Sequence, residues 1–458
     1  MQIPLFFIFI VLSLTGCGEP IGEGIPRDVI DDNDDFVYLD QECSKCDFVI
    51  ATEEFLFDGV ENNVQPGDTI CFQGGQRGGV GLRNIHGNEE NPVVIINCEG
   101  LVELFEEGSH GMRVTQSSYF HITGLGATEH KYGFNLATTN PGGNSLVIEK
   151  RSTNFEVDHV EVSQGGYAGM VCRSDATCDG SISRSNFTQF NTRIHHNYIH
   201  NTSGEGMYVG GSHWASGFAF ANDCFGTTLF EPELVGVRIY SNLVEDTGRD
   251  AIQVGSAVED CKIYDNIVRN YALNRDEGHL SGYQINGGTT GEFYRNIAIG
   301  GFGYGVFLLG RGDNTLYSNI IIRPLRDGII TGDRNPTPGA GFYIINNTII
   351  SPGDKGFTIF SNETEGTVYY NNIVTNPGLT FFSIETNDVT LDTSNNILTN
   401  NVEALMFVDA ANNDFRLQEG SIAIDAGLDV SSYGVDTDFL GNPRPVGEYD
   451  VGAIEKQE

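Results

Sequence analysis

Residues 239–244 read IYSNLV and residues 263–268 read IYDNIV, and this phrase returns throughout the second half of the chain. Each copy joins an apolar residue, an asparagine and a second apolar stretch, and the further copies are IHHNYI (194–199), FYRNIAI (293–299), LYSNIII (316–322), YIINNTII (343–350), VYYNNIV (368–374) and TSNNIL (393–398). The aligned asparagines lie 45, 24, 30, 23, 28, 25 and 24 residues apart, at Asn197, Asn242, Asn266, Asn296, Asn319, Asn347, Asn372 and Asn396. The repeat is therefore about 24 residues long, with insertions.

A second strand recurs between these phrases, as GMYVGG (206–211), AIQVGS (251–256), GYQINGG (282–288), GVFLLGR (305–311), GIITGD (328–333) and GFTIFS (356–361). A unit of two short strands cannot bury its apolar face alone, so stacking of the units is required. We therefore predict an all-β parallel β-helix in which each repeat is one coil. The asparagines should then form a ladder of side-chain amides at an internal turn. The 58 glycines and 14 prolines, with little helical periodicity, agree with this class.

Both ends of the repeat region carry a family resemblance. VQPGDTICF (64–72) resembles the opening strand of right-handed β-helix proteins of the pectate-lyase-like superfamily, and YFHITGL (119–125) and FEVDHVEV (155–162) look like early coils. NNDFRLQEGSIAIDAG (412–427), LGNPRP (440–445) and YDVGAIE (449–455) resemble the closing module of secreted bacterial β-helix proteins. The resemblance implies a right-handed β-helix with an N-terminal cap over 41–411 and a closing module over 412–458. It leaves the substrate open, because this scaffold hosts lyases, hydrolases, epimerases and binders.

The N-terminus is typical of export. Residues 1–16 are uncharged and too short to span a bilayer, and they end at LTGC with Cys17, which resembles a bacterial lipoprotein signal with an acylated cysteine. No lysine or arginine precedes the apolar run, so an ordinary secretory signal is the alternative. Residues 17–40 are acidic and predict a solvated tether. We expect a monomer, exported and lipid-anchored at the bacterial outer membrane or cell surface.

Eight cysteines remain once Cys17 is set aside, an even number that suits disulfides in an oxidising compartment. Proximity in sequence predicts the pairs Cys43–Cys46, Cys71–Cys98, Cys172–Cys178 and Cys224–Cys261. A zinc site at Cys43 and Cys46 lacks a second nearby Cys/His pair and is not favoured.

The formal net charge of -37 excludes nucleic acid and anionic lipid as natural partners. It favours a neutral polysaccharide over a polyanionic one, unless a cation such as calcium intervenes. Calcium is the cofactor that oxygen-rich acidic clusters would suit.

When the second strands are aligned by their leading glycine or alanine, they place one residue per coil in a column of Ala168, Glu205, Asp250, Ser281, Tyr304, Asp327 and Lys355. Because strand side chains alternate, Met207, Ile252, Tyr283 and Val306 should point inward. The outward positions should form a stripe along which a sugar chain could lie, with Tyr208, Gln253, Gln284 and Phe307.

Glu205 and Asp250 are the candidate pair for acid–base work on a glycosidic bond. Their 45-residue separation fits one coil with an insertion, about 5 Å apart as in a retaining glycosidase, or nearly two coils, closer to 10 Å and the inverting geometry. Acidic residues before glycine are also ordinary turn residues, so a structural role is the alternative.

Loops after these strands contribute further candidates. The insertion at 211–236 carries His213 and Trp214, whose indole would stack on a sugar or anchor the loop. His279, in a polar loop, is a third candidate catalytic group. Arg249 would contact a uronate carboxylate or an acidic neighbour. The pair His195-His196 lacks further ligands nearby in sequence, so no metal site is predicted there.

Two functions fit these observations. One is a surface enzyme that binds and cleaves a polysaccharide, as a glycoside hydrolase or a calcium-assisted lyase. The lyase variant is weakened by the strand AIQVGS, which has no lysine where the family resemblance would place a base; Lys262 is the nearest. The other is a non-catalytic surface protein that binds glycan or protein through the same stripe.

Overall fold

The computed structural model describes residues 36–457 apart from 220–223, 225, 336 and 388. The expected signal peptide, Cys17 and most of the expected tether lie outside the described residues. Residues 36–40 lie against the folded body, since the Leu39 amide donates to the Leu125 carbonyl oxygen at 2.7 Å. The body therefore begins before the expected boundary at residue 41.

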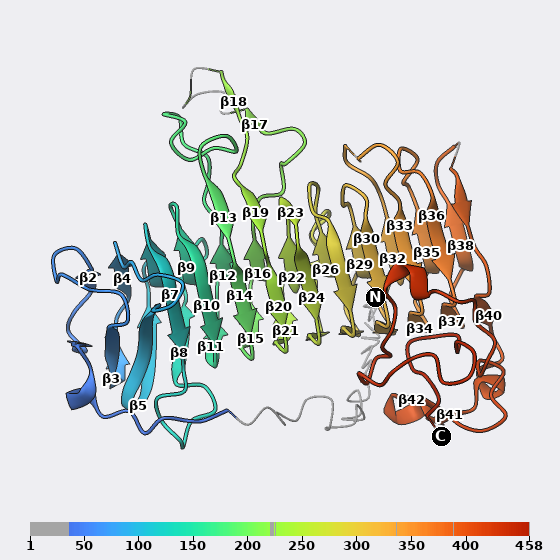
Figure 1. Ribbon diagram of the computed structural model, residues 1–458, viewed down its shortest axis with the longest axis horizontal. Helices are drawn as coiled ribbons and strands as arrows, with labels where there is room; N and C mark the ends of the chain where they lie inside the picture. Colours follow the sequence, from blue (N-terminus) through green and yellow to red (C-terminus); the bar gives the residue numbers. More distant parts are fainter. Residues whose placement is uncertain (1–35, 220–223, 225, 336, 388, 458) are drawn as a thin grey trace, which may run out of the picture.

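The described chain is a right-handed parallel β-helix whose coils stack side by side along its length (Figure 1). One long wall is a 12-stranded parallel sheet of β2 (Leu56–Asp58), β4 (Val80–Arg83), β6 (His110–Thr115), β9 (Asn144–Glu149), β12 (Ala168–Cys172), β16 (Glu205–Val209), β22 (Ile252–Val254), β26 (Ser281–Ile285), β29 (Tyr304–Leu308), β32 (Ile329–Thr331), β35 (Lys355–Ile359) and β38 (Thr380–Ile384). The predicted fold class is confirmed.

The remaining walls form one 23-stranded sheet with two rows of strands. The first row is β1 (Phe48–Ile50), β3 (Thr69–Arg77), β5 (Val93–Glu106), β7 (Ser118–Thr123), β10 (Thr153–Asp158), β14 (Thr192–His195), β20 (Arg238–Tyr240), β24 (Cys261–Tyr264), β27 (Gly291–Tyr294), β30 (Asn314–Tyr317), β33 (Phe342–Ile345), β36 (Thr367–Tyr370) and β39 (Leu391–Asp392). The second row is β8 (Phe134–Thr138), β11 (Val160–Ser163), β15 (Tyr198–Thr202), β21 (Leu243–Thr247), β25 (Ile267–Arg269), β28 (Ile297–Ile299), β31 (Ile320–Ile322), β34 (Thr348–Ile350), β37 (Ile373–Thr375) and β40 (Ile397–Thr399).

Short elements decorate this body. A three-stranded parallel sheet of β13 (Thr188–Phe190), β19 (Glu233–Val235) and β23 (Ala257–Glu259) extends it at the loops, and the antiparallel pair β17 (Phe218–Ala219) and β18 (Thr228–Leu229) lies farther out (Figure 1). The pair β41 (Phe407–Asp409) and β42 (Asp414–Leu417) belongs to the C-terminal part. The 3-10 turns are η2 (Cys43–Lys45), η3 (Val402–Leu405), η4 (Ala410–Asn412) and η5 (Ser431–Tyr433). Among the described residues, no helix has the length and apolarity needed to cross a membrane.

The predicted asparagine ladder runs without a break from Asn197 to Asn396, at the corner between the two rows of the large sheet. The Asn296 side chain illustrates it: its Nδ2 donates to Asn319 Oδ1 at 3.1 Å and to the Ile263 carbonyl oxygen at 2.8 Å. Its Oδ1 accepts from the Nδ2 of Asn266 at 3.0 Å. The residue before each asparagine is left-handed, as at Arg295 with φ of 53°. The ladder thus satisfies the buried polar groups of a sharp turn.

The column of glycines that heads the 12-stranded sheet has a steric cause. A Cβ on Gly206 would lie 2.5 Å from the carbonyl oxygen of Ala251 on the next coil. A residue without a side chain fits such an approach with no shift of the backbone, and Ala251 is the alanine in this column of glycines. These glycines keep the coils close, and the residue before each of them is held at a fixed position.

The C-terminal segment packs along the flank of the β-helix rather than on the solenoid interior (Figure 1). Phe415, Phe439 and Ile454 pack against outward isoleucines of β25, β28, β31 and β34. The Ala453 amide donates to Thr348 Oγ1 at 2.9 Å. The segment thereby covers an apolar surface that the repeat alone would leave exposed.

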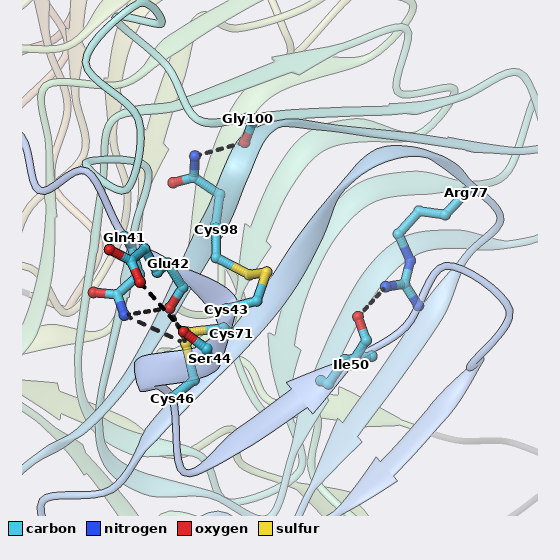
Figure 2. Close-up of a disulfide and its surroundings, with 11 residues drawn as sticks. Gln41, Glu42, Cys43, Ser44, Cys46, Ile50, Cys71, Arg77, Cys98 and Gly100 are labelled. Atoms are coloured by element: carbon cyan, nitrogen blue, oxygen red, sulfur yellow. Dashed lines mark hydrogen bonds between the residues drawn. A yellow bond between two sulfur atoms is a disulfide. The ribbon is translucent and has the colours of Figure 1, made fainter.

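The four disulfide pairs predicted from sequence proximity are wrong. The described residues form Cys43–Cys98, Cys46–Cys71 and Cys178–Cys224, and the first two tie η2 to β5 and β3 (Figure 2). Neighbouring coils, rather than neighbouring residues, bring sulfurs together. Cys172 and Cys261 are buried thiols because they point into the apolar core, away from the loops that carry Cys178 and Cys224.

Replacement of Asn296 by alanine should lower the free energy of unfolding by about 3 kcal/mol, because several buried donors and acceptors lose their partner at once. Urea unfolding followed by circular dichroism measures this change. Asn396→Ala is the matched control, since Asn396 ends the ladder and bonds to the ladder on one side only. Equal losses for the two variants would contradict the ladder's role.

Candidate active site

Glu205 and Asp250 occupy the same position on neighbouring coils. Glu205 is the first residue of β16, and Asp250 lies two residues before β22. Met207 pairs with Ile252, and the Gly206 amide donates to the Asp250 carbonyl oxygen at 3.0 Å. The 45-residue separation is therefore a single coil with an insertion, the closer of the two arrangements that the sequence allowed.

Both carboxylates are buried, with Glu205 and Asp250 each 0% exposed. Asp250 Oδ1 accepts a hydrogen bond from the Ser281 amide at 2.7 Å. Its Oδ2 and both oxygens of Glu205 have no hydrogen-bond partner among the described residues. A buried carboxylate without a partner is costly, so these oxygens depend on nearby charge.

His279 supplies that charge from the loop between β25 and β26. Its Nδ1 lies 3.2 Å from Glu205 Oε1 and 3.4 Å from Asp250 Oδ2. The His279 side chain is 36% exposed, whereas the two carboxylates beneath it are closed to solvent. The structure thus brings together Glu205, Asp250 and His279, the three residues that the sequence predicted to be catalytic.

The loop that carries His279 is fixed to the corner before Asp250. The Ala272 amide donates to the Arg249 carbonyl oxygen at 3.0 Å, and the Asn274 amide donates to the Gly248 carbonyl oxygen at 2.8 Å. These backbone bonds position the loop over the start of β22. His279 is therefore held by the scaffold as well as by charge.

Arg249 borders the same cluster. Its Nε lies 2.9 Å from Asp276 Oδ2, and its Nη1 lies 3.8 Å from Glu205 Oε1. Arg249 was expected to contact a uronate carboxylate or an acidic neighbour, and in the structure it contacts acidic neighbours. The guanidinium adds positive charge on the solvent side of Glu205.

The pKa values of Asp250 and His279 are displaced upward. Burial raises the pKa of Asp250 to about 6, against the opposing pull of His279. The close approach of its Nδ1 to the carboxylates of Asp250 and Glu205 raises the pKa of His279 to about 9. Near neutral pH the cluster thus combines the protonated imidazole of His279 with the carboxyl group of Asp250, whose pKa lies close to the pH of the solution. A pKa near the working pH suits a group that donates and accepts protons in catalysis.

The expected open stripe beside this cluster is closed. Tyr208, Gln253 and Gln284 are 5%, 1% and 5% exposed. Ser212, which the sequence analysis missed, accepts from Gln253 Nε2 at 2.7 Å and from Asn286 Nδ2 at 3.1 Å, and its Oγ lies 2.7 Å from the Tyr208 hydroxyl. The insertion after β16 therefore begins against the strands, at Ser212, before it projects outward. The one signal for Ser212 in the local sequence is its place directly after Gly210 and Gly211, which follow β16.

Trp214 anchors this insertion. Its Nε1 donates to Glu233 Oε1 at 2.9 Å, and the guanidinium groups of Arg184 and Arg311 lie 4.7 and 5.1 Å from the centre of the indole. The ring also packs against Gly288, where a Cβ would lie 2.3 Å from it. Of the two expected roles, stacking on a sugar or anchoring the loop, the contacts of Trp214 fit the anchor.

His213 and Phe307 do not join the cluster in the contacts that the structure records. The His213 ring packs on Phe218 with centroids 4.1 Å apart, and its amide donates to Glu231 Oε2 at 3.0 Å. The Phe307 ring packs edge-on against Tyr304 at 5.9 Å. Their predicted part in sugar binding stays a prediction.

The donor set does not fit calcium. Donor atoms of Glu205, Asp250 and His279 lie within 4.8 Å of one another, which is close enough for a metal. Calcium, however, takes six to eight oxygen ligands, and this set offers two carboxylates, one of them bonded to the Ser281 amide, and a nitrogen. Arg249 adds positive charge near the same Glu205 oxygen that His279 faces.

No family model and no curated protein matches the chain. Among solved structures, a GH136 lacto-N-biosidase from Eubacterium ramulus is similar with a TM-score of 0.54 and 12% identity over 73% of this chain and 62% of that chain, so the chain spans less than two thirds of that enzyme. The pectate lyase Pel9A matches with a TM-score of 0.43, at 12% identity over 90% of this chain and 97% of that chain. The alginate lyase from Paenibacillus sp. str. FPU-7 matches with a TM-score of 0.38, at 14% identity over 76% and 99%.

His279 should make the stability of the protein pH-dependent. Its pKa is raised from 6.5 to about 9 on folding, so its stabilising charge is fully present below pH 6.5 and lost as the pH rises through about 9. Urea midpoints of the wild type and of His279→Gln should differ most below pH 6.5 and converge above about pH 9. A difference that stays constant across this range would show that the imidazolium does not hold the carboxylates.

Proposed function

We propose that this protein is a glycoside hydrolase that cleaves a polysaccharide with Glu205 and Asp250. The observation that carries the proposal is the pairing of two buried carboxylates on adjacent coils, with donor atoms within 4.8 Å under a histidine. Retaining glycosidases place their two carboxyl groups about 5–5.5 Å apart, whereas inverting enzymes need about 6.5–9.5 Å. The close pair therefore favours a double displacement.

Asp250 is the general acid of the proposed reaction. Burial raises its pKa to about 6, so a large fraction of the group carries a proton in weakly acidic solution. Asp250 gives this proton to the glycosidic oxygen while the bond from that oxygen to the anomeric carbon breaks. The leaving sugar departs as a neutral alcohol.

Glu205 is the nucleophile. Its carboxylate attacks the anomeric carbon as the leaving group departs, and a glycosyl ester forms. Asp250, now ionised, takes a proton from water, and the resulting hydroxide displaces Glu205 from the sugar. Both carboxyl groups return to their starting states, so atoms and charges balance over the two steps.

His279 stabilises the resting site and controls access to it. Its imidazolium lies against both carboxylates, which solvent does not reach. A sugar ring must displace this side chain to contact Glu205. Arg249, 31% exposed at the rim, remains as the positive neighbour of Glu205 when His279 moves.

The substrate class follows from charge and fold. A net charge of -37 favours a neutral polysaccharide over a polyanion. The same architecture carries a GH136 lacto-N-biosidase, which supports a sugar substrate for this fold without identifying it here. The alternative is a non-catalytic glycan or protein binder. The burial of Glu205 and Asp250 favours it, because solvent does not reach either carboxylate. Its binding surface would lie outside the stripe, since Tyr208, Gln253 and Gln284 are covered.

Activity should follow the two carboxylates. Purified protein is incubated with a panel of neutral and anionic polysaccharides, and reducing ends are measured together with the absorbance of unsaturated uronates. Glu205→Gln and Asp250→Asn should each lower the rate of reducing-end release about 100-fold or more. The wild-type rate should fall as the pH rises through about 6, because Asp250 then loses the proton that it must donate.

Asp327→Asn is the matched control. Asp327 holds the same column position three coils beyond Asp250 and is buried. Its carboxylate accepts from the Thr358 hydroxyl, and no histidine of the described residues contacts it. Its replacement should leave the rate unchanged. No product from any polysaccharide, with ligand binding unaltered in Glu205→Gln and Asp250→Asn, would overturn the enzyme proposal and favour the binder.

We also propose that the protein is exported and held at the cell surface by a lipid on Cys17. The support is the LTGC sequence at residues 14–17 and the disulfides of the described chain, which suit an oxidising compartment. The acidic residues after Cys17 would keep the β-helix away from the membrane.

Cys17→Ser should move the protein from the membrane fraction to the soluble exported fraction, because only the anchor is lost. Cell fractionation with immunoblotting measures the change, and Cys172→Ser, at a buried thiol, is the control that should stay with membranes. A Cys17→Ser variant that remains membrane-bound would contradict the anchor.

A further inference from the structure

A second cluster of histidines and carboxylates lies on the first row of the 23-stranded sheet, away from Glu205. It comprises His121 on β7, Glu156 and Asp158 on β10, and His195 on β14. Glu156 pairs in register with His121, and Asp158 pairs with His195. Three successive coils thus bring the four side chains together.

The alternation of each strand puts these side chains on the outer face. Their neighbours Phe120, Val157 and Ile194 are at most 1% exposed and belong to the apolar core. Residues 156 and 158 are two positions apart, so both point away from that core. The cluster therefore lies on the outer face of the sheet, outside the apolar core, with Asp158 and His195 themselves buried.

The donor atoms of the cluster point at one another. His121 Nε2 contacts Asp158 Oδ2, and one donor atom each from His121, Glu156 and Asp158 lies within 4.8 Å of the others. His195 Nε2 lies 2.8 Å from Glu156 Oε1 and 4.0 Å from Asp158 Oδ2. Arg193 approaches Glu156 at 3.7 Å through the other oxygen, Oε2.

Surrounding groups hold these side chains in place. Asp158 Oδ1 accepts from the Thr123 hydroxyl at 2.7 Å and lies 2.7 Å from His159 Nδ1, which leaves Oδ2 aimed at His121. Tyr240 stacks on the His195 ring with centroids 4.5 Å apart. Metal ligands in proteins are oriented by such outer hydrogen bonds.

We propose that His121, Glu156 and Asp158 bind a divalent transition-metal ion, with His195 orienting Glu156. One imidazole nitrogen and two carboxylate oxygens suit zinc, whose ligand atoms in a tetrahedral site lie roughly 3.3 Å apart. To reach this spacing, His121 and Asp158, which are in direct contact, would move apart, while the more widely separated donor atoms would move closer. His121 and Glu156 are 27% and 30% exposed, so an ion has a route from solvent and coordination positions remain for water.

The bound ion would act as a clamp across coils. It would join β7 to β10, and through Glu156 and His195 it would couple β10 to β14. Binding to the folded chain alone raises stability by mass action. The proposal is independent of the glycoside hydrolase assignment, since the two clusters occupy different sheets.

Zinc binding to the chelator-treated protein tests the site. Isothermal titration with Zn²⁺ should show a site in the wild type, and Zn²⁺ should raise its unfolding temperature. His121→Gln and Asp158→Asn should each weaken binding about tenfold or more and abolish that rise. Asp158→Asn keeps the shape of the side chain, so it guards against a fold defect in the other variant.

Two matched control variants test where on the protein Zn²⁺ binds. His200→Gln removes a histidine that also meets a carboxylate on the sheet surface, Glu161 at 2.9 Å, and it should bind Zn²⁺ like the wild type. His279→Gln disrupts the other histidine–carboxylate cluster and should also leave this site intact. The proposal is overturned if the wild type takes up no Zn²⁺, or if binding follows His279 or His200 instead of His121 and Asp158.

Discussion

The asparagine ladder fixes how the coils of the second half of the β-helix stack. Each amide bonds to the asparagine of the next coil, to a carbonyl of its own coil and to a carbonyl of the preceding coil, so the coils from Asn197 to Asn396 turn their corner at the same place. The spacing between ladder residues varies from 23 to 45 because extra residues leave as loops elsewhere. Hydrogen bonding thereby fixes the corner while the rest of each coil is free to change in length.

The candidate active site follows from the regular stacking of the coils. A 21-residue difference in coil length does not displace Asp250 from Glu205, because the insertion after β16 projects outward and the strands still pair. Two carboxylates thus face each other in a closed environment, where their charge is unfavourable. The imidazolium of His279 offsets part of this electrostatic cost. The cost of burial that it does not offset raises the pKa of Asp250.

Much of the fold and part of the site could be predicted from the sequence. The repeated asparagine and the glycine or alanine at the start of each second strand predict the coil and the column that contains Glu205 and Asp250. Both are local patterns that show in the sequence. The disulfide pairs were predicted wrongly, although the separation of 25 positions from Cys46 to Cys71 matches one coil. The covering of Tyr208 and the cluster around Asp158 were not predicted either. Both depend on the three-dimensional path of the long insertions and of the irregular early coils, which the local sequence does not show.

The central claim is that Glu205 and Asp250 cleave a glycosidic bond through a covalent intermediate. The most direct measurement is the anomeric configuration of the first-formed product, followed by proton NMR during turnover of a polysaccharide that the protein degrades. A double displacement predicts that the product keeps the configuration of the substrate, because the two carboxyl groups are too close to hold a water between them. A product of inverted configuration, or one with an unsaturated uronate end, would contradict it.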